Sequence, residues 1–141
     1  MAVNALTKLA AELSDIPLKE MDGSPMLDEN NEPVTATMFS PASKIYQVAR
    51  QARKRKAMRK VRENGGKLEA VADDSDDVIE FLCAITKRFN GLEIPGEADQ
   101  VRAIYSHDQL GYIRDQLSDA ADNWENFTQA SKPSAAFTHA N

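Results

Sequence analysis

Apolar residues recur every three or four positions over two stretches of this chain, which is the spacing of one face of an α-helix. Within 75–89 the periodic residues are Val78, Phe81, Leu82, Ile85 and Phe89. Within 107–128 they are Leu110, Ile113, Leu117, Ala120, Ala121, Trp124 and Phe127. The pattern predicts two amphipathic helices over these ranges, and we expect their apolar faces to form the core.

Polar residues predict where these helices begin and end. The carboxylates of Asp73–Asp77 complement the positive end of a helix dipole, so we expect the first helix to start there. Ser106–Gln109 has the spacing of a capping box ahead of the second helix. Asn90-Gly91 is a typical helix end. A short additional helix is predicted over 97–105, where Val101 and Ile104 are the apolar positions.

A further helix is predicted over 40–63, where charged residues outnumber apolar ones. Ser40 suits the N-cap, and Pro41 suits the first turn because the N–H group that proline lacks has no partner there. Asn64 and Gly65 are typical of the turn that follows a helix. The apolar positions form a narrow stripe, which we expect to anchor the helix to the domain: Ile45, Val48, Ala49, Ala52, Met58 and Val61.

The first 39 residues have a different character. Apolar residues at helical spacing from Val3 to Leu13 predict a short helix over 3–13. Two later segments, Ile16–Met21 and Val34–Phe39, carry β-branched residues in partial alternation and are separated by turn sequences rich in Asp, Asn, Gly and Pro. This arrangement predicts a small β-hairpin or β-arm.

The predicted elements place the chain in the mainly α class, with about four helices and a small N-terminal β element. A length of 141 residues suits one domain. We expect 1–39 to hold the N-terminal helix and the β-arm, 40–130 to form the helical domain, and 131–141 to be a flexible polar tail.

Basic residues concentrate in one part of an acidic chain. Nine of the 17 Lys and Arg residues fall between Lys44 and Arg62 with no acidic residue among them, although the net charge of the chain is −5. Outside this block, the remaining basic residues face 22 acidic ones, which leaves the rest of the chain strongly negative. A basic helix on an acidic body is expected to meet nucleic acid, an acidic protein surface or the chain's own carboxylates.

The surroundings of the basic block favour protein over nucleic acid. No aromatic residue follows Tyr46 within the block, so it lacks a stacking platform for single strands. The acidic remainder of the chain would also repel a phosphate backbone. The candidate partner-binding residues are Arg50, Arg53, Lys54, Arg55, Lys56, Arg59, Lys60 and Arg62, together with Trp124 and Phe127 near the end of the last helix.

Residues able to carry catalysis or bind a metal are few and scattered. The only histidines are His107 and His139, and the only cysteine is Cys83, beside a core stripe. These three do not have the spacing of a tetrahedral zinc site. Asp28–Glu32 lacks the glycine and the final glutamate of a calcium loop. We therefore expect no catalytic residue, metal site or cofactor, and do not expect an enzyme.

Nothing in the sequence predicts a membrane protein. No apolar run approaches the roughly 20 residues that a spanning helix needs. The segment Met1–Leu13 lacks the basic start and the long apolar centre of a signal peptide. A single cysteine fits a reducing cytoplasm.

Several short segments follow one another along the chain in a characteristic order. They are Asp22-Gly23, Glu32-Pro33, Ser40-Pro41, Asp77–Thr86, Gly91–Glu93, Tyr105-Ser106, Tyr112–Leu117 and Asn126-Phe127. From about Ile16 to Ser131, this layout resembles the tail assembly chaperones of tailed bacteriophages and small phage tail proteins of similar organisation.

The resemblance implies a mainly helical, self-associating protein without enzymatic activity, acting in the cytoplasm of the infected host. Members of that family are thought to coat the long tape measure protein until tail tube subunits polymerise around it. Its implied partners are therefore the tape measure protein, the tail tube protein and further copies of itself. Two alternatives stay open: a structural virion protein of the tail or the head–tail junction, and a nucleic-acid-binding protein using the basic helix at 44–62.

Overall fold

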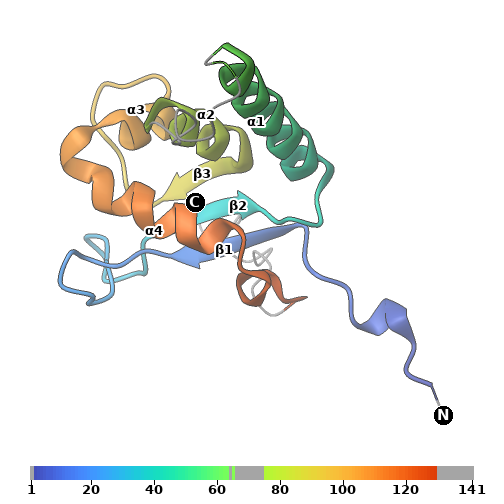
Figure 1. Cartoon of the computed structure of the whole chain (residues 1–141). Coiled ribbons are helices and arrows are strands. Elements are labelled where there is room, and N and C mark those ends of the chain that lie inside the picture. Colours follow the sequence, from blue (N-terminus) through green and yellow to red (C-terminus); the bar gives the residue numbers. More distant parts are fainter. Residues whose placement is uncertain (1, 64, 66–74, 130–141) are drawn as a thin grey trace.

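The computed structural model describes residues 2–63, 65 and 75–129. It has a mainly α fold with a small three-stranded antiparallel sheet, as Figure 1 shows. The fold class expected from the sequence is confirmed. Asp73, Asp74, His139 and the tail predicted at 131–141 lie outside the described residues.

The N-terminal β element is confirmed as a hairpin. Strand β1 (Leu13–Pro17) runs antiparallel to β2 (Thr35–Phe39), with Leu13 opposite Phe39. The connection between them continues as an arm, in which the Leu18 N–H donates to the Val34 carbonyl at 2.9 Å. The arm places Leu18 and Val34 in the core, with exposed fractions of 1% and 2%.

A third strand corrects the helix predicted over 75–89. Helix α2 (Ser75–Ile85) ends four residues early, and the chain continues directly into β3 (Thr86–Asn90), which pairs with β2. An irregularity opposite Thr37 and Met38 shifts the register, as a β-bulge does. It allows Thr86 and Phe89, three positions apart, both to contact the core, because Thr86 bonds the buried Tyr105 hydroxyl and the Phe89 ring lies 5.3 Å from the Tyr105 ring. This spacing resembles that of a helix face.

The remaining helices differ in their bounds from the predicted ones. They are α1 (Lys44–Glu63), α3 (Gln100–Ser106) and α4 (Gly111–Ala121), with single 3₁₀ turns η1 (Ala5–Thr7), η3 (Asp108–Leu110) and η4 (Trp124–Phe127). The helix predicted over 3–13 is wrong, since only η1 forms and Leu13 belongs to β1. The helix predicted over 107–128 is interrupted after Ala121, where Asn123 caps η4.

Two predicted caps are also replaced by neighbouring residues. Ser43, not Ser40, caps α1: its Oγ accepts the Tyr46 N–H at 3.1 Å. The Ser40 carbonyl instead accepts the Ser43 N–H, which makes Ser40 part of the preceding turn. His107, not Ser106, caps η3 through its Nδ1 atom, which accepts the Gln109 N–H at 3.2 Å.

The core lies where α2, α3 and α4 meet each other and one face of the sheet. Its fully buried members include Ala36, Met38, Leu82, Ile85, Ile104, Ile113 and Leu117. The opposite face of the sheet is polar, because Asn90 Nδ2 donates to the hydroxyls of Thr35 and Thr37, each at 2.9 Å. None of the helices in the described ranges is both long and apolar enough to cross a membrane.

Candidate functional site

The first half of the basic helix α1 is attached to the domain by aromatic and polar contacts. The Tyr46 ring meets the Phe81 ring of α2 edge-on, with 5.5 Å between the ring centres. The Tyr46 hydroxyl donates to the carboxylate of Asp122, beyond the end of α4. Arg53 lies two turns further along α1. Its guanidinium lies over the Phe81 ring, 4.9 Å from the ring centre, in a cation–π arrangement.

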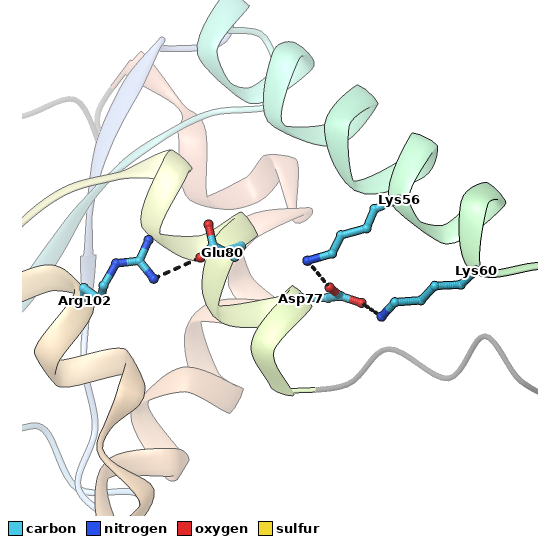
Figure 2. Close-up of polar contacts among 5 residues, drawn as sticks. All are labelled: Lys56, Lys60, Asp77, Glu80 and Arg102. Atoms are coloured by element: carbon cyan, nitrogen blue, oxygen red, sulfur yellow. Dashed lines mark hydrogen bonds and ion pairs between the residues drawn. The ribbon is translucent and has the colours of Figure 1, made fainter. Parts of the chain in front are cut away.

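An ion-pair cluster fixes the second half of α1 to the start of α2. Figure 2 shows Lys56 and Lys60 converging on Asp77, with 2.7 Å between Lys56 Nζ and Asp77 Oδ1. Hydrogen bonds from Lys56 and then Lys60 lower the pKa of Asp77, and burial opposes them. On the next turn of α2, Glu80 accepts from Arg102 of α3 at 3.0 Å, so a chain of charges links the three helices.

Of the apolar stripe predicted to anchor α1, Ala49 does pack against the core, but Ile45, Val48 and Ala52 do not. Ile45 and Val48 are 44% and 55% exposed, and Ala52 is also exposed. The residues that face α2 are instead Tyr46, Ala49, Arg53, Lys56 and Lys60. Long basic side chains can cover an apolar neighbour with their stems while their charges pair, which explains how they replace aliphatic residues at this contact.

Exposed residues on another side of α1 form a surface that we call the α1 outer face. Its spacing alternates between three and four positions along the helix, which places all members on one side. They are Ile45, Val48, Ala52, Arg55, Arg59 and Arg62. All six are exposed, the first three are apolar and the last three are basic. The face therefore offers one apolar half and one cationic half to a partner helix.

The candidate partner-binding residues are consequently divided between two environments. Arg53, Lys56 and Lys60 lie against α2, whereas Arg50, Lys54, Arg55, Arg59 and Arg62 are exposed. Trp124 is 56% exposed, but Phe127 is a core residue with 1% exposure. Phe127 is held by its backbone as well, because its carbonyl accepts the Ala11 N–H at 2.8 Å. The sequence did not separate these groups because Lys and Arg are usually assigned to solvent.

A second exposed apolar surface was missed because it was predicted to be a packed helix. Val3, Leu6 and Leu9 are 69%, 73% and 57% exposed. Figure 1 shows this N-terminal segment leading away from the folded body. The chain returns to the domain at Ala11, which is 1% exposed.

Two polar groups considered for chemistry cap turns in the described part of the chain. His107 caps η3, and Asp28 caps its own turn, since its Oδ1 accepts the N–H groups of Asn30 and Glu32. Burial raises the pKa of the Cys83 thiol, which disfavours its reactive thiolate. No cluster of three or more His, Cys, Asp or Glu suited to a metal occurs among the residues that the structure describes.

Replacing Asp77 by asparagine is expected to destabilise the fold by about 1–2 kcal/mol, as a lost charged hydrogen-bond pair does when its lysine partners can return to solvent. Because the folded-state pKa of Asp77 is lowered, its stabilising effect is present above the ordinary value of 3.8 and is lost as the pH falls below it. Urea unfolding at pH 7 and near pH 3 measures both effects. Asp76→Asn is the control, and an equal loss in both variants would contradict the assignment.

Replacing Tyr46 by phenylalanine keeps the ring on Phe81 and removes the hydrogen bond to Asp122. We expect a loss of about 0.5–1.5 kcal/mol at neutral pH. Burial, with the Asp122 bond adding to it, raises the pKa of Tyr46 from 10.0 to about 12. The stabilising effect of the neutral hydroxyl is complete below pH 10 and is lost as the pH rises through about 12. Unfolding curves of both proteins should therefore converge at alkaline pH; a constant difference would refute this.

Comparison with known proteins gives no relative. No protein-family model, no curated protein and no solved structure matches this chain.

Proposed function

We propose that this chain is an assembly chaperone of a tailed bacteriophage, which binds the tape measure protein and supports assembly of the tail tube. The observation that carries the proposal is the distribution of exposed apolar side chains. Of the nine large ones on the described part of the chain, six lie on the N-terminal segment and α1. Exposed apolar side chains that lie close together are typical of protein-binding sites. The phage context rests on the resemblance of segment order given above.

The N-terminal segment is the surface that suits a helical client. Val3, Leu6 and Leu9 repeat every three positions, so a helix through them would present one apolar side. Such a short helix is marginal alone and gains stability by packing on another helix. A tape measure protein is long and helical, so it would offer matching apolar faces along its length. Binding coupled to helix formation gives reversible contacts, which suit a chaperone that is later displaced by the tail tube.

The folded body suits repeated binding along one client. It keeps its charged surface outward, and Asp77 and Phe81 hold α1 against α2. A coat of such bodies would screen the client's apolar surface from water and from other clients. Charged exteriors of this kind oppose aggregation.

Co-expression tests the proposal. A tape measure protein encoded by the same phage genome should become at least several-fold more soluble when this chain is present, and the two should co-purify. The variant Val3→Ser/Leu6→Ser/Leu9→Ser should lose this effect, whereas Met21→Ser/Leu27→Ser, which alters exposed apolar residues elsewhere, should keep it. An unchanged client yield with the unaltered chain would sink the proposal.

Nucleic-acid binding is the second candidate, favoured by one observation. Lys54, Arg55, Arg59 and Arg62 line a shallow depression of about 400 Å³ on α1, with Met58 and Gln51 between them. Binding of duplex DNA by such residues would fall steeply with salt. Gel retardation at low salt distinguishes the candidates, because the chaperone proposal predicts no retention.

Mass spectrometry of purified virions separates the chaperone, which should be absent, from a structural virion protein, which should be present.

A further inference from the structure

Helix α4 carries a second charged surface that matches the α1 outer face. We call it the α4 acidic face, formed by Asp115, Asp119 and Asp122, all of them exposed. Asp115 and Asp119, four positions apart, lie on one side of the helix, and Asp122 follows three positions later, just beyond its last residue Ala121. Arg55, Arg59 and Arg62 have the same spacing, with the opposite charge.

The two faces also have the same length. Each spans seven positions, or roughly 10 Å at 1.5 Å per residue. Three carboxylates on one helix can therefore meet three guanidinium groups on another at the same time. Guanidinium and carboxylate groups form the better-ordered kind of ion pair, with two parallel hydrogen bonds.

The two faces do not meet within one chain. The Tyr46 hydroxyl bonds to Asp122, so it is the first turn of α1 that lies beside the end of α4. Arg59 is 13 positions further along α1, roughly 20 Å away along the helix axis. Among the described residues, no ion pair joins Arg55, Arg59 or Arg62 to a carboxylate. The described part of the chain thus leaves these arginines available to an acidic surface on another molecule.

One relative orientation of α1 from one copy and α4 from another sets the charged residues of both faces opposite each other. When the two helices run antiparallel, Arg62 lies opposite Asp115 and Arg55 opposite Asp122, and Arg59 is offset from Asp119 by one position, about 1.5 Å along the axis. Beyond Asp122 the chain reaches Trp124, which is 56% exposed. Trp124 thus follows the acidic face along the chain as Ala52 and Val48 precede the basic half of the α1 outer face, so exposed apolar residues adjoin each charged set. The dipoles of antiparallel helices also attract each other.

We infer that copies of this chain join through the α1 outer face of one copy and the α4 acidic face of the next. The inference rests on the proposed function, in which several copies bind along one client, and it names the surfaces through which neighbouring copies would join. Because the two surfaces are different, each added copy leaves one of each kind unoccupied, so the contact generates an open array unless the rotation closes a ring.

Charge swapping tests this pairing on the purified chain without a client. Arg55→Glu/Arg59→Glu and Asp115→Lys/Asp119→Lys each place like charges opposite one another, so each variant alone should associate at least tenfold more weakly than the unaltered chain. An equimolar mixture should associate again, because the reversed faces of one variant match those of the other. Asp122 is left unchanged since it holds Tyr46.

Sedimentation velocity at low and high salt gives the readout, and circular dichroism shows that each variant is folded. The control Lys8→Glu/Lys87→Glu makes the same change of charge at two exposed positions outside both faces and should associate normally. A mixture that stays dissociated overturns the inference, as does a control as weak as the test variant or an unaltered chain that stays monomeric. Client solubilisation by the unaltered chain in those cases would leave the proposed function standing.

Discussion

Replacing Phe81 by alanine is expected to destabilise the fold by about 3–5 kcal/mol, the usual loss for a large buried aromatic residue. Phe81 is 7% exposed and contacts α1 at two points, through the Tyr46 ring and beneath the Arg53 guanidinium. Its removal therefore leaves a cavity and separates α1 from its main support. Chemical denaturation measures the loss, and trypsin cleavage within α1 should accelerate as the helix detaches more often.

Phe81→Leu is the matched control for this prediction. Leucine keeps most of the buried apolar volume but cannot offer a ring face to Arg53 or an edge contact to Tyr46. We expect a smaller loss of about 1–2 kcal/mol, of the size assigned to the aromatic contacts themselves. Equal losses for leucine and alanine would mean that the ring contacts, and not burial, dominate. A loss below 1 kcal/mol for alanine would contradict the attachment of α1 described above.

Replacing Leu117 by alanine is the second large effect, with an expected loss of about 2–5 kcal/mol. Leu117 has no exposed surface and lies in the core on the inner side of α4. The exposed residue Glu97 provides the control, since Glu97→Ala, outside the core and both proposed faces, should change stability by less than about 0.5 kcal/mol. Thermal unfolding compares the two. A small effect at Leu117 would mean that α4 is not seated on the core.

The sequence predicted the helical class, the hairpin and most of the core, because these depend on periodic apolar residues. Leu82, Ile85, Ile113 and Leu117 were all placed on core faces and all are fully buried. The end of α2 was missed for a physical reason. The bulge in β3 brings Phe89 to the core at a spacing that a helix would also give, so the pattern alone does not separate a helix from a bulged strand.

The side of α1 that faces the domain was predicted wrongly because aliphatic residues were assumed to make the contact. The structure uses Tyr46 and the stems of Arg53 and Lys56 instead, while Ile45 and Val48 face solvent. The residues of α2 that face α1 decide which side of α1 is buried. Phe81 offers a ring to Tyr46 and Arg53, and Asp77 offers a carboxylate to Lys56. A pattern within one segment contains no information about either partner.

That correction changes the interpretation of the basic block. Three of its residues hold the helix in place, and three others share one side with the exposed aliphatic residues. The same block therefore has an inner face that stabilises the fold and an outer face available to a partner. A uniformly basic rod would favour phosphate backbones, whereas a face that is half apolar favours another helix.

The central proposal is that many copies of this chain coat one tape measure protein. Light scattering coupled to size-exclusion chromatography, applied to the co-expressed and co-purified proteins, measures the number of copies directly. We expect a single complex whose mass corresponds to several copies of this chain for each tape measure chain. Elution of this chain apart from the tape measure protein, with no shared complex, would contradict the account.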